Sequence, residues 1–201
     1  MGFCPKYRVD CRLLPQTHFK RKNNLTWRCT TAALFAALTA LFTCISIPIG
    51  PVPINLATLS VLLAGALLGA RWGAISQLIY VALGAVGLPV FSGFSGGLGK
   101  LLGPTGGYIV GYVLGAFVIG AITERFGRDL VPLSVAAALG YATLYLTGTL
   151  YFLWLTGSGL LYAFGLCVFP FLPGDAAKIA LGHILVRRLW PYLMQETAGQ
   201  A

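Results

Sequence analysis

Long apolar segments without a charged side chain dominate the chain. Four of them can be read directly from the sequence, at residues 29–70, 72–99, 101–123 and 130–174. A transmembrane helix needs about 20 consecutive apolar residues, so the four segments hold about six such helices once prolines divide the longer ones. The pattern predicts an all-α, polytopic membrane protein built as a six-helix bundle.

Prolines and glycines set the expected helix ends. Pro48, Pro51 and Pro53 interrupt the first segment, because proline lacks an N–H donor and clashes with the preceding turn. Ser158–Leu172 is too short to cross a bilayer and is expected to be a re-entrant or surface segment before the last helix. The six predicted helices are Cys29–Ile47, Leu56–Ala70, Trp72–Leu88, Thr105–Thr123, Pro132–Leu155 and, from about Gly174, the helix that ends at Trp190.

Basic residues alternate between the predicted helices in a way that sets the orientation. Seven precede the first helix, and the others fall mainly between helices two and three, between four and five, and after six. Cytoplasmic flanks collect lysine and arginine, so both termini are expected inside. This placement accounts for most of the net charge of +9, so no nucleic-acid partner is expected.

Composition supports a single membrane domain. The chain is 57% hydrophobic and 9% charged, with a mean hydropathy of +0.81, far from a water-soluble domain. We expect a mobile basic leader at 1–28, a transmembrane domain at 29–193 and a cytoplasmic tail at 194–201. No cleavage pattern follows the first helix, and five cysteines without metal or redox spacing suggest no metal.

Two charged residues stand inside the apolar run FLPGDAAKIALG. Asp175 follows Pro173 and Gly174, where an N-cap carboxylate would stabilise the helix. Lys178 has no such explanation, since a cation in the first turn opposes the helix dipole and lies on the predicted outer side. At positions i and i+3 the two side chains share a face. They either neutralise each other or form a ligand site, because ionisable residues near a membrane interior are often functional.

The two predicted outer loops are candidates for the same site. The first, SIPIGPVPINL, has proline-stiffened backbone and one amide side chain, Asn55. The second is rich in glycine, which allows close approach to another group. Phe91 and Phe94 would be poorly placed in water, so this loop is expected to fold over a cavity.

A hydrolase is the alternative function. Gly93-Phe94-Ser95-Gly96 fits the G-x-S-G pattern of rhomboid-type intramembrane serine proteases, and His183 could serve as the base. Ser95 lies in an outer loop, whereas His183 lies deeper along the last helix, so the dyad is not expected to close. The string SGGLGK lacks the residues of a phosphate loop at two positions, which excludes nucleotide binding there.

Several unusual strings together resemble one family. They are GPVPINLATLSVLLAGALLGARWGAISQLIYVALGAVGLPVF, SGGLGKLLGPTGGYIVGY and FPFLPGDAAKIALG, within about residues 29–190. They resemble the BioY family, the biotin-binding S components of energy-coupling-factor (ECF) vitamin transporters. The resemblance implies a non-enzymatic subunit of the bacterial cytoplasmic (inner) membrane. It would capture biotin outside and deliver it with a transmembrane coupling subunit and an ATPase pair, with no cofactor of its own.

The resemblance also implies which residues contact the ligand. In the P-G-D-x-x-K pattern of the family the acid and the lysine bind it, which points to Asp175 and Lys178. Asp175 could accept from the ureido N–H groups of biotin, and Lys178 could donate to the ureido oxygen or to the carboxylate. The residues expected to complete the pocket are Asn55, Gln77, Tyr80, Phe91, Phe94 and Ser95; Lys100 is a further polar option in the second loop.

Helix one carries small residues at spacing four, which let another helix approach closely. Two overlapping sets are possible, Ala32 with Ala36 and Ala33 with Ala37. The resemblance implies that one of these faces docks on the coupling subunit, and packing inside the bundle is the alternative.

Overall fold

Helices make up nearly all of the computed structural model, which describes residues 25–47, 54–157, 159, 163, 165 and 171–199. Each of the six helices expected from the sequence is present, with shifted ends, and a short helix and a two-stranded hairpin lie in the loops. The elements are α1 (Leu25–Cys44), β1 (Ser46–Ile47), β2 (Ile54–Asn55), α2 (Ala57–Leu68), α3 (Ala70–Ala85), α4 (Leu98–Leu101), α5 (Gly106–Phe126), α6 (Leu130–Thr156) and α8 (Leu172–Gly199). The all-α prediction is confirmed.

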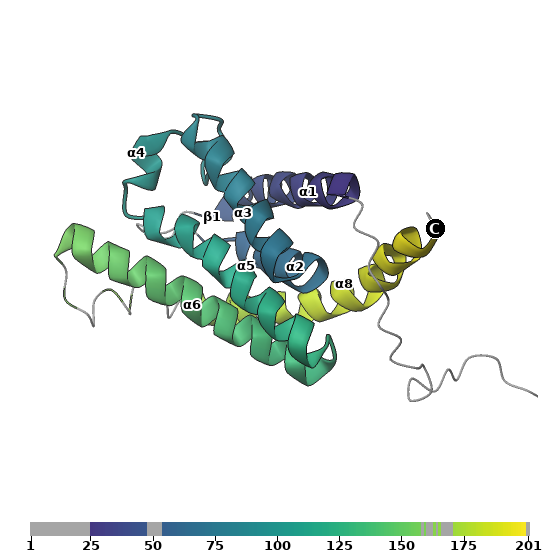
Figure 1. The fold of residues 1–201 in the computed structure, drawn as a ribbon. Coiled ribbons are helices and arrows are strands. Elements are labelled where there is room, and N and C mark those ends of the chain that lie inside the picture. Colours follow the sequence, from purple (N-terminus) through teal and green to yellow (C-terminus); the bar gives the residue numbers. More distant parts are fainter. Residues whose placement is uncertain are drawn as a thin grey trace, which may run out of the picture.

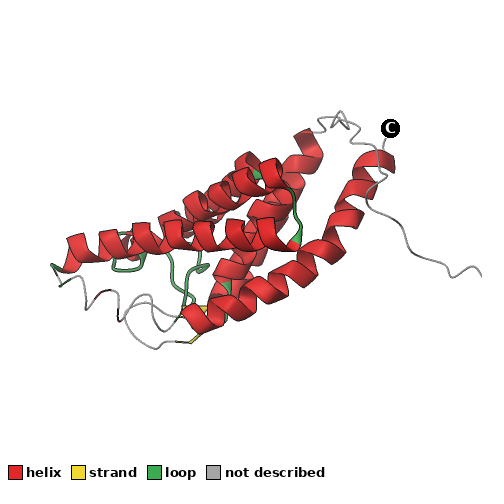
Figure 2. Cartoon of the chain, turned by 90° about the horizontal axis from the view of Figure 1, so that it is seen from below, coloured by secondary structure: helices red, strands yellow, loops and turns green. Residues whose placement is uncertain are grey.

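The shortest of the long helices, α2, forms the centre of the bundle. Every one of its 12 residues is buried, as expected for a helix that is apolar on all sides. It contacts α1, α3, α5, α6 and α8 (Figure 1). Figure 2 shows that nearly all of the described chain is helical. At 1.5 Å per residue α2 is about 18 Å long, well short of the roughly 30 Å of a bilayer core.

By length and composition alone, α1, α5 and α6 are each able to cross a membrane, and α2 is a shorter apolar helix. Large apolar side chains lie exposed along these helices, among them Leu34, Leu139 and Trp154. Such surfaces are stable against lipid rather than water. These features are those of a membrane protein.

Arginine side chains tie together one end of the bundle. The first turn of α1, the α2–α3 junction, the α5–α6 turn and the end of α8 all lie at this end (Figure 1). The Arg28 guanidinium lies 5.8 Å from the Trp72 ring. Arg128 donates from Nε to the Ala66 carbonyl at 2.6 Å and covers the Trp190 ring at 3.5 Å. The hairpin and α4 lie at the opposite end.

Some predicted boundaries differ from the observed ones. Helix α1 begins at Leu25 rather than Cys29, and α8 continues to Gly199, past its expected end at Trp190. Most of the segment Ser158–Leu172, expected to be re-entrant or at the surface, lies outside the described residues. So does the leader up to residue 24.

Glycine allows α5 to pack directly on the α2–α3 junction. Gly69 ends α2 with φ +85°, a conformation that favours glycine. A Cβ atom built on Gly120 of α5 would lie 2.3 Å from the Ala70 nitrogen. Since this neighbour is backbone, it cannot move aside as a flexible side chain could.

We therefore expect Gly120→Ala to destabilise the protein by about 1–3 kcal/mol through overpacking. Thermal unfolding of the purified protein in detergent measures the effect. The matched control is Gly99→Ala in α4, where an added Cβ meets nothing within 4 Å. Equal melting temperatures for the two variants would contradict the close packing of α5 on this junction.

Candidate ligand-binding site

Asp175 and Lys178 form an ion pair on the face of α8 that packs against α2. The Lys178 Nζ lies 3.1 Å from the Asp175 Oδ1, and the two residues are only 4% and 7% exposed. Helix α8 begins at Leu172, so Asp175 lies within the first turn instead of at the expected N-cap. Its carboxylate contacts other side chains.

Hydrogen bonds from α2 and α6 complete this network. Lys178 donates to the Thr58 hydroxyl at 2.9 Å, and Thr58 donates to the Asp175 Oδ1 at 3.3 Å. Tyr145 donates to the Asp175 Oδ2, and Tyr141 donates to the Thr58 carbonyl at 3.0 Å. A buried ion pair needs such additional partners, because desolvation of two charges costs several kcal/mol per ion. Three helices are thereby joined at one point.

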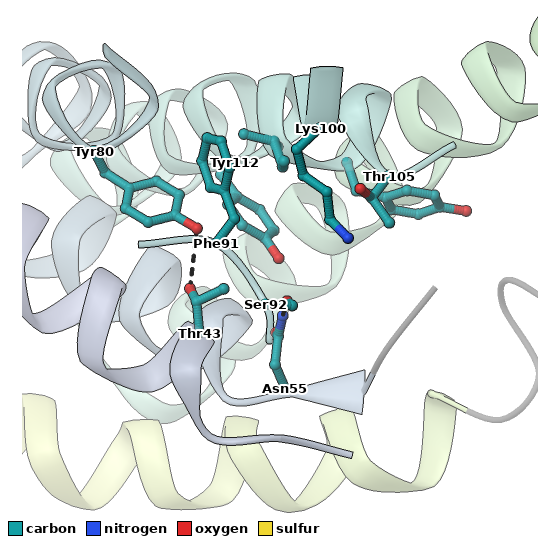
Figure 3. A pocket seen from close by; sticks show the side chains of 10 residues that line it. Thr43, Asn55, Tyr80, Phe91, Ser92, Lys100, Thr105 and Tyr112 are labelled. Carbon is teal, nitrogen blue, oxygen red and sulfur yellow. Dashed lines mark hydrogen bonds between the residues drawn. The ribbon is translucent and has the colours of Figure 1, made fainter. Parts of the chain in front are cut away.

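A narrow cavity, partly open to the outside, lies at the end of the bundle opposite the arginines. Aromatic rings and a few polar groups form the wall (Figure 3). The lining residues are Thr43, Asn55, Tyr80, Phe91, Ser92, Lys100, Thr105, Tyr108, Ile109 and Tyr112.

Two groups of aromatic rings shape the cavity. Tyr80 packs edge-on against Phe91 with ring centroids 5.6 Å apart, and its centroid lies 6.3 Å from that of Tyr112. On the other side, the centroid of Tyr108 lies 6.5 Å from that of Tyr145, the residue that donates to Asp175. Tyr145 therefore stands between the cavity wall and the ion pair.

Glycines make room for two of these rings. A Cβ atom on Gly84 would lie 2.0 Å from the ring of Phe91, and one on Gly148 would lie 2.3 Å from the ring of Tyr108. Because both rings occupy the space that a side chain would fill, the glycines of α3 and α6 help to set the shape of the cavity.

Asn55 connects the two loops above the cavity. Its Nδ2 donates to the Ser92 hydroxyl at 3.1 Å, and its Oδ1 accepts from the Ala57 N–H at 3.1 Å. It therefore links the second loop to the start of α2.

Lys100 and Thr105 add a second polar region to the wall. The Lys100 ammonium points into the cavity (Figure 3), and within the described part of the chain it has no carboxylate partner. The Thr105 hydroxyl is buried without a hydrogen-bond partner among the same residues. Thr105 precedes α5, whose N-terminal end carries a partial positive charge. This region suits an anion.

The comparisons with known proteins decide the family. A family model described as the BioY family matches residues 16–195. The chain belongs to the BioY family. The match starts at residue 16, so the resemblance reaches further toward the N-terminus than the expected start at about residue 29.

Other BioY proteins cover most of this chain. It is 44% identical over 158 residues to the probable biotin transporter BioY of Pyrococcus horikoshii, with 78% of this chain and 92% of the relative covered. It is 42% identical over 179 residues to the biotin transporter BioY of Rhodobacter capsulatus, with 81% and 93% covered. A crystal structure of the S-component for biotin from an ECF-type ABC transporter matches with a TM-score of 0.77 and 31% identity, over 84% of this chain and 93% of the other.

The structure brings some of the site residues expected for a BioY protein to the cavity and leaves others away from it. Asn55, Tyr80 and Phe91 line it, whereas Asp175 and Lys178 are not among the lining residues. Gln77 is fully buried and donates to Thr39 of α1. Phe94 and Ser95 lie in the second loop but not in the cavity wall: Phe94 is 72% exposed, and the Ser95 hydroxyl donates to the Ser92 carbonyl at 2.8 Å.

The Ser–His alternative has no geometric support. The hydroxyl of Ser95 donates to its own loop. The His183 Nε2 lies 2.9 Å from the Ser134 hydroxyl and joins α8 to α6. Each member of the proposed dyad therefore has another partner.

Burial distinguishes the two alanine faces of α1. Ala32 and Ala36 are buried in the bundle at 0% and 1% exposure, so they cannot also form a docking surface as the structure stands. Ala33 and Ala37 are exposed. Only the second set is available to a partner.

Sequence reasoning missed the tyrosines of α5 and α6. Tyr108 and Tyr112 lie four residues apart, as do Tyr141 and Tyr145, so each pair shares one face of an otherwise apolar helix. That spacing predicts hydroxyl groups inside the bundle. Thr58 gave no comparable signal, because threonine is common in apolar helices.

We expect Asp175→Asn or Lys178→Met alone to destabilise the protein by about 3–5 kcal/mol, because each leaves one charge buried without its partner. The double variant should be more stable than either single one. Thermal unfolding in detergent gives the comparison. Additive losses in the double variant would show that the two charges do not depend on each other.

Proposed function

We propose that this protein is the high-affinity, biotin-binding S component of an ECF vitamin transporter. The observation that carries the proposal is the cavity at the end of the bundle opposite the arginines, whose wall is connected to the buried ion pair through the contact of Tyr108 with Tyr145. Membership of the BioY family and the match to the S-component for biotin support it. Ser95 and His183 do not approach each other as a hydrolase would require, so we favour a transport role.

In the proposed topology six helices, α1, α2, α3, α5, α6 and α8, cross the bacterial cytoplasmic membrane. The end that carries Arg28, Arg71 and Arg128 faces the cytoplasm, in accordance with the preference of lysine and arginine for that side. Both termini are then inside, and the cavity opens outward. Helix α2 fits this topology because neighbouring helices bury every one of its residues.

The proposed ligand orientation follows from the hydrogen bonds already made. Asp175 accepts from three side-chain donors, and a carboxylate has about four acceptor sites. One site therefore remains for a ureido N–H. Tyr80 donates its only proton to Thr43, so its oxygen can accept from the ligand. Lys178 has one N–H without a described partner, which suits the ureido oxygen.

The carboxylate of biotin is assigned to the other side of the cavity. The charge of Lys178 is already compensated by Asp175 at 3.1 Å, so it attracts a second carboxylate weakly. Lys100 is the one cation among the described residues that line the cavity, and the unpartnered Thr105 hydroxyl belongs to the same wall. A charge-assisted hydrogen bond from Lys100 would orient the valerate chain.

Energy for uptake would come from partner subunits. We propose that a transmembrane coupling subunit and an ATPase pair act with this protein, and that the exposed Ala33–Ala37 face of α1 docks on the coupling subunit. Small residues at this spacing let two helices approach closely inside a membrane.

Calorimetric titration of the purified protein tests the ligand and its orientation. We expect saturable biotin binding without turnover. Lys100→Met should weaken biotin binding by about 10–100-fold, because a hydrogen bond to a charged group is worth about 1.5–3 kcal/mol. The primary amide of biotin lacks the negative charge, so its affinity should fall by less than about threefold in Lys100→Met.

Two results would contradict this assignment. Absence of biotin binding by the unaltered protein would remove the proposed function. Equal losses of affinity for biotin and its amide in Lys100→Met would refute Lys100 as the partner of the carboxylate. Labelling of Ser95 by an active-site serine probe would instead favour the hydrolase.

Docking by α1 is tested by a bulky substitution on its exposed face. Ala37→Trp should leave biotin affinity unchanged and reduce uptake at least about tenfold in cells that express the coupling subunit and ATPases, because it blocks close helix approach. Ala142→Trp is the matched control, since Ala142 is an exposed alanine of α6. Equal uptake by the two variants would exclude this face as the docking surface.

A further inference from the structure

A line of polar side chains runs from the cavity into the interior between α1, α2 and α3. All five members are at most 2% exposed. Burying a hydroxyl or an amide among apolar groups is unfavourable unless it is hydrogen-bonded, so their mutual contacts have to hold them. The members are Thr39 and Thr43 of α1, Ser60 of α2, and Gln77 and Tyr80 of α3.

The first connection lies at the cavity itself. Tyr80 donates to the Thr43 Oγ1 at 3.2 Å, as the dashed line in Figure 3 shows. Thr43 donates in turn to the carbonyl of Thr39 at 2.6 Å. Two hydrogen bonds in series therefore connect the Tyr80 hydroxyl to the Thr39 carbonyl of α1.

The second connection lies one helical turn deeper. Gln77 donates from Nε2 to the Thr39 Oγ1 at 3.1 Å, and the Ser60 hydroxyl lies 2.7 Å from the same oxygen. Thr39 donates its one proton to the Phe35 carbonyl at 2.8 Å, so Ser60 has to be the donor to Thr39. Helices α1, α2 and α3 thus meet at one hydroxyl oxygen.

The spacing of these residues makes the two connections act together. Thr39 and Thr43 are four residues apart on α1, and Gln77 and Tyr80 are three apart on α3. Residues at these intervals lie above one another on a helix, so α1 is held to α3 at two heights about 6 Å apart. These two points of attachment fix both the rotation of α1 about its axis and its position along that axis relative to α3.

The deeper connection is not fully satisfied. The Gln77 Oε1 and the neighbouring Ser76 Oγ are buried without a hydrogen-bond partner among the described residues. Unpaired buried polar atoms are uncommon in native structures and call for an explanation. A network with unused acceptors has more than one arrangement of similar energy, which allows it to respond to a change at Tyr80.

We propose that Gln77, Thr39 and Ser60 are positioning residues that couple ligand occupancy at Tyr80 to the placement of the exposed face of α1. The inference rests on the proposed function and names the route by which the filled cavity affects docking. A ligand N–H donated to the Tyr80 oxygen strengthens the Tyr80–Thr43 bond, since hydrogen bonds in a chain polarise one another.

The deeper connection determines what α1 does in response. With Thr43 restrained at the cavity and Thr39 held by Gln77 and Ser60, α1 adopts one orientation. Its exposed Ala33–Ala37 face, on the side opposite Thr39, is then presented to the coupling subunit in that orientation. A ligand shifts such an equilibrium only by its preference for one arrangement, and the Tyr80 contact supplies that preference.

The central test is Gln77→Met, which has a similar length and lacks the N–H donor. In the purified protein, we expect the dissociation constant for biotin to change by less than about threefold, because Gln77 is not part of the cavity wall. Uptake with coexpressed partner subunits should fall at least about tenfold if coupling carries about 1–3 kcal/mol.

Hydrogen exchange gives a direct readout of α1. Residues 33–43 should gain protection when biotin is added to the unaltered protein, and this gain should be absent in Gln77→Met. In Gln77→Glu the buried carboxyl group is expected to stay protonated, because desolvation disfavours its charged form, and it can then donate to Thr39. Gln77→Glu should therefore recover both the gain in protection of α1 on biotin binding and a large part of the uptake.

Ser134→Ala serves as the matched control. It removes an interhelical hydrogen bond of the same kind, between α6 and His183 of α8, but it does not touch α1 or α3. Uptake and α1 protection should stay within about twofold of the unaltered protein, because distant sites act independently.

Each other outcome overturns one specific statement. Normal uptake in Gln77→Met, or a parallel loss of binding and uptake, would overturn the coupling role. If Gln77→Met does not fold, Ser60→Ala removes one hydroxyl from the same oxygen and is judged by the same criteria. Absence of biotin binding by the unaltered protein would instead refute the proposed function.

Discussion

The buried ion pair between Asp175 and Lys178 is the interaction on which the rest of this structure depends. Two charges placed among apolar helices are tolerated only where other polar groups replace the lost water. Thr58 of α2 and Tyr145 of α6 supply those groups. The requirement for partners fixes how α8 approaches both helices, and it places a polar surface next to the aromatic wall of the cavity.

The short central helix α2 makes this arrangement possible. Because α2 begins only at Ala57, Asn55 directly before it reaches the cavity. Thr58 follows at once, at the level of the ion pair. Glycines on the surrounding helices allow the approach: without Gly84 and Gly148, the rings of Phe91 and Tyr108 would have no space. The cavity thus follows from short length and small side chains as much as from its polar groups.

Much of the architecture could be predicted from the sequence, and the candidate site only in part. Helix positions follow from charge-free length and from prolines, which are local properties. Lys178 stood out because it contradicts both the helix dipole and the charge distribution. The sequence could not show whether Lys100 matters more than the other polar residues of its loop, because its role depends on the cavity that it faces. Gln77 was expected in the pocket wall, and in the structure it bonds to Thr39 of α1.

By itself, the sequence determined that this is an all-helical membrane protein, that its arginines gather at one end of the bundle, and which acid and base stand out. These conclusions depend on composition and spacing along one chain, where hydrophobicity and backbone geometry act locally. Only the tertiary structure decided that Ala33 and Ala37, and not Ala32 and Ala36, remain exposed, and which tyrosines share a cavity. Both depend on the rotation of each helix about its axis, and that rotation is set by contacts between helices far apart in the sequence.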